Sequence, residues 1–451
     1  MTASLDRRRL LQLGLGGAAG ALGLGLASCA RGPGGSKEGS FKQPRVNIPD
    51  QYSGRKPVIA WSAFGGGSGE AMAEIATMFN DSQTDIFLDV QFQGSYGDIG
   101  QKLVASMQSG VAPDMVIVAE DSQGQLQMQE VASPLNEFVS PETINRLNKV
   151  MIDQWTVNGQ IYQIPFARST PVFYYNRDLY AKIGLPDRGP ETWTEFLDWA
   201  EEIHKFKNPQ GDPTPALTST NSGWYFQAFI WEWGGKYSDG LDVMVNQGGA
   251  VEAAQYFNDL YVKHGYGAAN VGQDSFNNGF VASGIYSTAS LATIEGAAKD
   301  RIGAAFIPAE KERAVPTGGS GWTVPIGIER TNKEAAGQVM EFFAQAENAA
   351  YWTLRSGYVP ITEDATETDI FKNQVAKNPN YQVAPDQLEY ARGTDPARSF
   401  VPGSGDILDT YIGLIYASDE PVQSVLDRMA TKLQRAADNV RPAYDLLMSG
   451  G

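Results

Sequence analysis

Short apolar runs alternate with helical patterns in the first part of the chain. Residues 58–62 and 115–119 are almost wholly apolar, and residues 87–92 alternate apolar and polar side chains as strands do. Between them, residues 70–79 and 98–109 place apolar side chains at helical spacing. The order strand, helix, strand, helix, strand predicts a parallel α/β sheet.

The glycine-rich run at residues 65–69 follows the first of these strands. It has neither the Gly-Lys-Ser/Thr ending of a phosphate loop nor the G-x-G-x-x-G spacing of a dinucleotide fold, so nucleotide binding is not expected. We expect a wide turn at the carboxyl end of the strand, where α/β folds bind their ligands.

The later chain has its own turn and strand signals. Residues 158–165, which begin Asn-Gly, predict a hairpin turn and a strand, residues 171–176 predict an aromatic strand, and Thr192 predicts a helix N-cap. From about residue 250 onward helical patterns predominate, and strands are expected at residues 303–308 and 324–328.

The N-terminus has the pattern of an export signal. Residues 7–9 are three arginines, residues 10–28 are apolar, and residues 26–29 read Leu-Ala-Ser-Cys, as in a bacterial lipobox. We expect a twin-arginine-type signal peptide at residues 1–28 and, after cleavage, a lipid on Cys29. A transmembrane anchor is the alternative, although the many glycines make a poor spanning helix. Residues 29–55 are expected to form a flexible tether.

Composition excludes several classes of function. The formal net charge of the 451 residues is −17, which argues against nucleic-acid binding because that needs a basic footprint. Cys29 is the only cysteine, so no disulfide forms within the chain, and the two histidines, His204 and His264, offer little for zinc or for nucleophilic catalysis. We expect no catalytic residue, no metal and no cofactor.

The order of motifs resembles that of extracellular solute-binding proteins of carbohydrate-type ABC importers, the maltose-binding-protein-like class. The motifs that carry this resemblance are the stretches 158–165, 172–176, 184–186, 192–193, 276–279, 347–350 and 357–360. Within the class the chain is most similar to the glycerol-3-phosphate and glycerophosphodiester-binding lipoproteins of actinobacteria. That likeness rests on residues 165–176, 184–190, 287–292 and 357–361.

The resemblance implies an α/β fold of two lobes, joined by hinge strands, with the ligand in an interlobe cleft. The expected N-terminal lobe comprises residues 56–168 and 290–325, and the C-terminal lobe residues 169–289 and 326–445. It also implies a monomer at the outer face of the cytoplasmic membrane, which delivers a small polyol or sugar to ABC permease subunits and their ATPase.

Nine residues are expected to bind this ligand. Trp224, Tyr96 and Tyr358 match family positions, are flanked by glycine, and would stack on the C–H faces of a polyol, although core packing explains most aromatic residues. The expected polar residues are Glu120, Ser169, Thr170, Ser290, Gly319 and Arg398. Glu120 ends the third strand, where cleft residues emerge, and Gly319 would offer a backbone N–H to a hydroxyl or an anion; a solvated charge and a flexible loop are the alternatives.

The expected ligand depends on one departure from the family. The family places an arginine after its C-terminal Phe-x-x-Gly loop, where this chain has Asp406, and Arg398 and Arg168 are the nearest substitutes. A carboxylate repels phosphate, so we expect a sugar, an oligosaccharide or a glycerophosphodiester, with glycerol-3-phosphate as the alternative.

Two other classes of function stay open at this point. A secreted glycoside hydrolase would use acid pairs such as Glu120 with Asp121 or Glu201 with Glu202, and a structural lipoprotein would bind no ligand.

Overall fold

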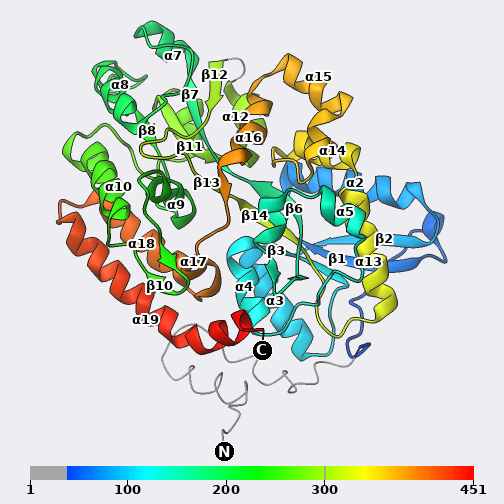
Figure 1. Ribbon diagram of the computed structural model, residues 1–451. Helices are drawn as coiled ribbons and strands as arrows, with labels where there is room; N and C mark the ends of the chain where they lie inside the picture. Colours follow the sequence, from blue (N-terminus) through cyan, green and yellow to red (C-terminus); the bar gives the residue numbers. More distant parts are fainter. Residues whose placement is uncertain (1–37, 299–300, 451) are drawn as a thin grey trace, which may run out of the picture.

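The computed structural model describes residues 38–298 and 301–450, and it contains two main sheets (Figure 1). The first sheet has the order β2-β1-β3-β14-β6. Its strands are β1 (Lys56–Ser62), β2 (Ile86–Phe92), β3 (Met115–Ala119), β6 (Ile164–Ser169) and β14 (Gly318–Thr323). The first three strands pair in parallel, as the sequence predicts, and β14 runs antiparallel to both of its neighbours.

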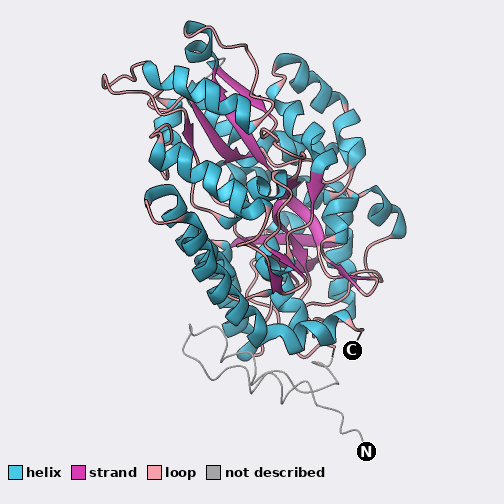
Figure 2. Ribbon diagram, turned by 60° about the vertical axis from the view of Figure 1, so that its left-hand side comes forward, coloured by secondary structure: helices cyan, strands magenta, loops and turns pink. Residues whose placement is uncertain are grey.

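The second sheet has the order β12-β7-β11-β8. Its strands are β7 (Pro171–Asn176), β8 (Leu217–Thr218), β11 (Ser283–Ser287) and β12 (Ile302–Ala305). Figure 2 shows the two groups of strands stacked along the long axis of the molecule, with helices around each. Two large apolar cores accompany the two sheets, which is the two-lobed architecture that the resemblance implies.

Helices cover both sheets, and each packs mainly into one core. Those of the first core are α2 (Gly66–Ser82), α3 (Tyr96–Gln108), α4 (Glu120–Met128), α5 (Pro141–Arg146), α6 (Lys149–Asp153), α11 (Gln273–Asn277), α12 (Leu291–Ala298), α13 (Arg330–Phe343), α14 (Ala346–Ser356), α15 (Asp369–Lys377) and α16 (Asn380–Gln387). Those of the second core are α7 (Arg177–Lys182), α8 (Trp193–Lys205), α9 (Gly223–Glu232), α10 (Gly249–Asn258), α17 (Pro396–Phe400), α18 (Ser404–Ala417) and α19 (Val422–Met448).

Three segments connect the two sheets. Thr170 alone separates β6 from β7, and Thr317 separates β13 (Val315–Pro316) from β14. The third connection is β15 (Ala391–Arg392), which pairs in parallel with β13. The paired β13 and β15 therefore lie where the chain passes between the lobes, which is where hinge strands are expected.

The helices after residue 326 divide between the two cores. The predicted boundaries place all of residues 326–445 in the second lobe. In the structure, however, α13 and α14 contact α2 of the first lobe, whereas α16 contacts β12 of the second sheet. From Ala397 onward the buried residues belong to the second core. The pattern of apolar positions on these helices shows that one face is buried, but it cannot show against which sheet.

Local predictions agree with the structure where a turn or a cap determines the geometry. The Asn158-Gly159 pair has positive φ at both residues and joins β4 (Thr156–Val157) to β5 (Gln160–Ile161), and the Thr192 side chain caps α8. The expected wide turn at residues 65–69 is wrong, because α2 begins at Gly66. The expected strand at 324–328 is also wrong: the strand is β14, and Gly327 (φ +84°) lies in the turn after it.

The described part of the expected tether lies against the first lobe. Ser40 N donates to Gly327 O (3.1 Å), Lys42 N donates to Gly110 O (2.9 Å), and Gln43 Nε2 donates to Pro57 O (3.1 Å). Residues 38–55 are therefore not a free tether, because their polar groups pair with the lobe. Residues 29–37, the signal peptide and Cys29 lie outside the described residues.

The remaining short elements are η2 (Asp50–Tyr52), β9 (Ser238–Asp239) with β10 (Asp242–Val243), η3 (Asp259–Lys263), η4 (Thr288–Ser290), η6 (Glu363–Glu367) and η7 (Leu388–Tyr390). Among the residues that the structure describes, no helix is both long and apolar enough to cross a membrane.

Candidate functional site

Most of the expected ligand-binding residues come together around the first half of β14. Gly319 pairs with Arg168 of β6, and Gly318 pairs with Ser169. Gly319 has φ +90°, and a Cβ there would lie 2.0 Å from Ala167 O, so only glycine allows the two strands to approach so closely. Gly319 is thus part of a strand at the lobe boundary, not of a flexible loop.

Glu120 and Arg398 form a buried ion pair between the two lobes. Glu120 opens α4 and is 4% exposed, whereas Arg398 belongs to α17 and is 7% exposed. Thr394 Oγ1 donates to the second carboxylate oxygen of Glu120 at 3.1 Å. Burial raises the pKa of the Glu120 carboxyl, and Arg398 opposes this shift. Burial alone would lower the pKa of Arg398, but Glu120 and then Asp121 raise it overall, so the guanidinium stays charged.

Two of the expected aromatic residues form one wall beside this pair. Tyr96 Oη lies 3.0 Å from Ser320 Oγ, and its ring meets the edge of Phe64. Tyr358 stacks on Trp352 with 6.1 Å between ring centroids, and its hydroxyl hydrogen-bonds with that of Tyr96. Both side chains are half-buried. Ser320 is the cross-strand partner of Ala119, the residue before Glu120, which relates these two hydroxyls to the ion pair.

Trp224, the third expected aromatic residue, belongs to the second lobe. It lies in the first turn of α9, which the Ser222 side chain caps. A Cβ on Gly318 would lie 2.5 Å from Trp224 Nε1, so the indole packs directly against the backbone at the start of β14. Its ring centroid is 4.8 Å from that of Tyr225.

Ser169, Thr170 and Ser290 lie at the connections between the lobes. Ser169 is 4% exposed and ends β6, and Thr170 Oγ1 accepts from Gln387 Nε2 at 3.3 Å. Thr170 is fully buried, and its hydroxyl oxygen is bonded to Gln387. It therefore stabilises the segment that joins β6 to β7 and does not present its hydroxyl at an open surface. Ser290 is half-buried in η4, next to the close contact between Ala289 and Gly357.

The position of Asp406 in the structure weakens the argument that its charge would exclude a phosphate ligand. This residue is exposed in the first turn of α18, whereas Arg398 is buried in the cluster. The carboxylate on which the argument against phosphate rests therefore faces solvent, where water screens its charge.

Sequence reasoning missed two polar residues of this cluster and undervalued a third. Arg168 is completely buried and lies over the Trp155 ring at 4.3 Å, and burial lowers its pKa to about 10. Its Nη2 donates to Gln154 Oε1 (2.8 Å) and Thr317 Oγ1 (2.7 Å). The place of Arg168 inside the motif at residues 165–176 could have pointed to this residue. Nothing in the sequence singles out Gln154 or Thr317.

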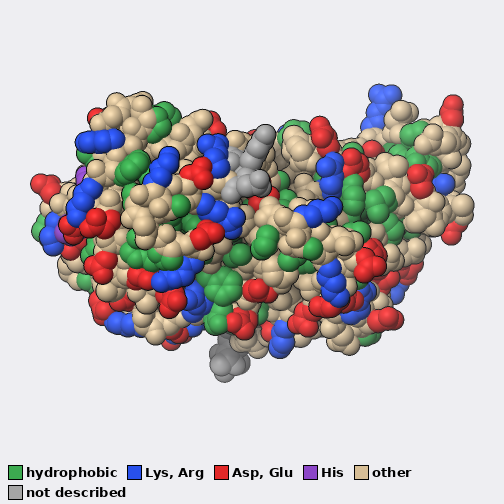
Figure 3. Space-filling view, turned by 90° about the horizontal axis from the view of Figure 1, so that it is seen from above, with side chains coloured by type: hydrophobic (Ala, Val, Ile, Leu, Met, Phe, Trp, Pro, Cys, Tyr) green, Lys and Arg blue, Asp and Glu red, His purple; other side chains and the backbone are tan. Residues whose placement is uncertain are grey.

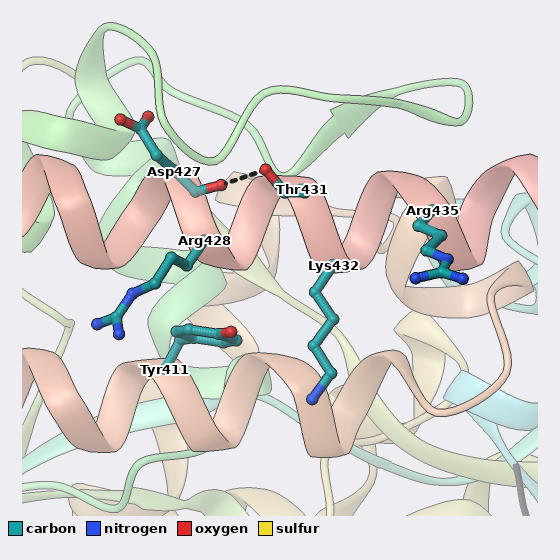
Figure 4. A pocket seen from close by; sticks show the side chains of 6 residues that line it. All are labelled: Tyr411, Asp427, Arg428, Thr431, Lys432 and Arg435. Atoms are coloured by element: carbon teal, nitrogen blue, oxygen red, sulfur yellow. Dashed lines mark hydrogen bonds between the residues drawn. The ribbon is translucent and has the colours of Figure 1, made fainter.

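A second groove lies away from the cluster, between α18 and α19. It is lined by Tyr411, Asp427, Arg428, Thr431, Lys432 and Arg435 (Figure 4). In this view Arg428 and Lys432 point toward α18, on either side of Tyr411. Because both helices belong to the second lobe, this groove is not an interlobe site. Acidic and basic side chains are mixed over the face shown in Figure 3.

The other candidate chemistries have no supporting arrangement in the described residues. Glu201 and Glu202 both pair with Lys205 on the exposed face of α8, at 3.2 and 2.7 Å. Glu120 is held by Arg398, so it does not oppose a second acid across a cleft. Within residues 38–298 and 301–450, no group of three or more His, Cys, Asp or Glu side chains is placed to hold a metal ion.

Comparison with known proteins defines the class. The profile of the bacterial extracellular solute-binding protein family matches residues 74–382, and the chain belongs to this family. It is accordingly a solute-binding component of an ABC importer, with the two-lobed periplasmic-binding-protein fold. Members of this family are exported.

Several individual proteins are similar to this chain over most of its length. The sn-glycerol-3-phosphate-binding periplasmic protein UgpB of Pectobacterium atrosepticum is 26% identical over 353 residues, covering 73% of this chain and 78% of the relative. UgpB of Mycobacterium tuberculosis, solved in complex with glycerophosphocholine, is 29% identical with a TM-score of 0.79, covering 85% of this chain and 99% of that one. A cyclic maltosyl-maltose binding protein of Arthrobacter globiformis shares the fold (TM-score 0.71, 20% identity, 88% and 100% coverage). These relatives are binding proteins.

Proposed function

We propose that this chain is the lipid-anchored receptor of an ABC importer for a glycerophosphodiester. The observation that carries the proposal is the buried Glu120–Arg398 pair, which joins the two lobes in the middle of the expected ligand-binding residues. A ligand held there contacts both lobes at once, and contact with both lobes is what makes hinge closure depend on the ligand.

The chemistry of the cluster favours a phosphodiester over the other candidates. The aromatic walls of Tyr96, Tyr358 and Trp224 suit the C–H faces of a glycerol moiety. Arg398 is already paired with Glu120, so it offers little to a phosphate dianion such as glycerol-3-phosphate. The similarity to a glycerophosphocholine complex supports the same choice. We place the lobe boundaries at Thr170, Thr317 and β15, with ligand between the lobes.

Ligand binding is tested by calorimetry and thermal unfolding of the mature protein with glycerophosphocholine, glycerol-3-phosphate, maltose and glucose. We expect glycerophosphocholine to bind, and a concentration 100 times its Kd to add about 2.7 kcal/mol to the free energy of unfolding. Trp224→Ala removes one aromatic wall and is expected to weaken binding at least about ten-fold, or about 1.4 kcal/mol.

The matched control is Phe206→Ala, because Phe206 is an exposed aromatic residue just after α8, a helix that carries none of the expected ligand-binding residues. It should bind as the wild type does. Unchanged affinity of Trp224→Ala would contradict the proposed site, and absence of any glycerophosphocholine binding would contradict the proposed ligand.

A neutral saccharide is the second candidate ligand, favoured by the adjacent rings of Trp224 and Tyr225. Binding of maltose or glucose without glycerophosphocholine would select it. Hydrolase activity is not proposed; incubation with glycans that yields no product would agree with a pure binding role.

A further inference from the structure

Several buried hydrogen-bond donors around the start of β14 have no partner. Arg168 uses Nη2 on Gln154 and Thr317, but its Nε and Nη1 donate to nothing. Nε2 of Gln154 and Nε1 of Trp224 are also buried without a partner. All four of these atoms are N–H donors, so the group that satisfies them must be rich in acceptors.

The direction of the Gln154 amide is determined by its neighbours. Its Oε1 accepts from Arg168 Nη2 at 2.8 Å and from Thr317 Oγ1 at 3.0 Å. Because a guanidinium can only donate, the amide oxygen must face Arg168 and the NH₂ group must face away. The excess of donors therefore follows from the chemistry of the guanidinium.

The four donors belong to one place in the fold. Thr317 accepts from Arg168, the next residue, Gly318, packs against the Trp224 indole, and Gly319 is the cross-strand partner of Arg168. Val359 N donates to Arg168 O at 2.8 Å, which brings the Tyr358 loop to the same strand. The donors thus lie among the expected ligand-binding residues.

Arg168 has no ion-pair partner among the described residues. Its hydrogen-bond partners are an amide and a hydroxyl, and its stacking partner is the Trp155 ring, whereas Arg398 is paired with Glu120. Glu120 opposes the lowering of the Arg168 pKa from a distance, but its carboxylate oxygens are bonded to Arg398 and Thr394. Asp121, the next acid, is 46% exposed and lies 3.9 Å from Arg398 rather than at Arg168. A buried charge without a counter-charge is costly, and a bound anion removes that cost.

We propose that Arg168, Gln154 and Trp224 form an anion subsite that takes the singly charged phosphodiester of the ligand. This inference rests on the proposed function and adds to it the residues that recognise the charge. One phosphodiester supplies a negative charge and several acceptor oxygens, which suits a guanidinium without an ion pair and the unpaired donors around it. A neutral saccharide would leave Arg168 without an ion-pair partner.

Gln154→Glu tests the subsite by supplying a counter-charge from the protein itself. The variant keeps the shape of the side chain and places a carboxylate against Arg168. We expect glycerophosphocholine affinity to fall at least about thirty-fold and the ligand-free protein to unfold at a higher temperature. Arg168→Met, which removes the cation, should show both changes as well. Arg435→Met, at an exposed position of α19, is the matched control and should show neither.

The outcomes separate this inference from the proposed function. If the wild type binds glycerophosphocholine and Gln154→Glu binds it equally well, the subsite is wrong and the proposed function stands. If the wild type binds only neutral saccharides, the proposed function fails and the subsite fails with it. If Arg168→Met lowers the unfolding temperature with affinity unchanged, Arg168 is only a structural support. A ligand-bound crystal structure with water alone on Arg168 Nη1 would also overturn the subsite.

Discussion

Burial and pairing decide what each polar side chain of this protein contributes. Arg398 and Glu120 satisfy one another, whereas Arg168 is equally buried but has no carboxylate partner. Glu232 presents the reverse case in the core of the second lobe. It is fully buried, Trp193 Nε1 donates to its Oε2 at 2.8 Å, and its Oε1 has no partner. Burial raises the pKa of Glu232 well above its usual range, and Trp193 opposes the shift only in part.

Glu232→Gln is expected to stabilise the protein as the pH rises. The folded state holds Glu232 protonated, so its own contribution to stability is complete below the unfolded pKa, which is about 4.3, and is lost as the pH rises toward the folded pKa. Glutamine keeps an acceptor for Trp193 and cannot ionise. The difference in unfolding free energy, measured with urea at pH 5 and pH 8, should grow by at most about 1.4 kcal/mol per pH unit. Glu201→Gln, on the exposed face of α8, is the control; an equal effect there would refute the explanation.

The sequence suggests candidate ligand-binding residues but not how their charges pair. Tyr96 and Trp224 were chosen because they match family positions, Glu120 because it ends the third strand, and Arg398 as one of the nearest substitutes for the expected arginine. The hydrogen bonds of Arg168 go to Gln154 and Thr317, which lie 14 and 149 residues from it in the chain and meet it only in the folded protein.

At the scale of elements, α4 of the first lobe and α17 of the second lobe pack closely against one another. A Cβ on Gly124 of α4 would lie 2.7 Å from the ring of Phe400 of α17. The same two helices carry Glu120 and Arg398. The absence of a side chain at Gly124 therefore allows the approach that forms the interlobe ion pair.

Gly124→Leu is expected to hold the lobes apart and to weaken ligand binding without touching the ligand. Overpacking of this kind costs about 1–3 kcal/mol, which here opposes the arrangement in which the helices touch. We expect affinity to fall about ten-fold or more and the radius of gyration with ligand to rise, measured by calorimetry and small-angle scattering. Gly100→Leu on α3 is the control, because a Cβ there meets no atom within 4 Å. Adding Phe400→Ala to Gly124→Leu should restore binding; failure to do so would point to a local effect on α4.

Individual elements were more predictable than their partners. In β1, β2, β3, α2 and α3, the spacing of apolar residues within each segment shows which face is buried, so each of these elements can be predicted from its own residues. The sheet that a helix covers is not local information, which is why α13 and α14 were assigned to the wrong neighbours. The sequence did not predict β14 because the first four residues of this strand are Gly-Gly-Ser-Gly. Glycine opposes strand formation except where backbones must approach closely.

At the scale of the whole molecule, the expected ligand-binding residues and the expected lipid anchor belong to different parts of the chain. The site residues span positions 96 to 398, and the chain before them is docked on the first lobe from Ser40 onward. Cys29 precedes Ser40 by eleven residues, a span of about 40 Å when fully extended. A tether that ran free to residue 55 would reach more than twice as far. With the proposed lipid on Cys29, the docked segment would keep the protein close to the membrane that contains its permease.

Cys29→Ala tests the anchor independently of the ligand. Cys29 is the only cysteine, so its loss removes the only sulfur that a lipobox could acylate. We expect the protein to move from the membrane fraction to the soluble fraction of the exporting cell, with its glycerophosphocholine affinity unchanged. Ser28→Thr, which leaves the sulfur in place, is the control. If the Cys29→Ala protein stays in the membrane fraction, residues 10–28 hold it there as a transmembrane anchor. If affinity falls as well, the tether takes part in binding, and the separation of anchor and site is wrong.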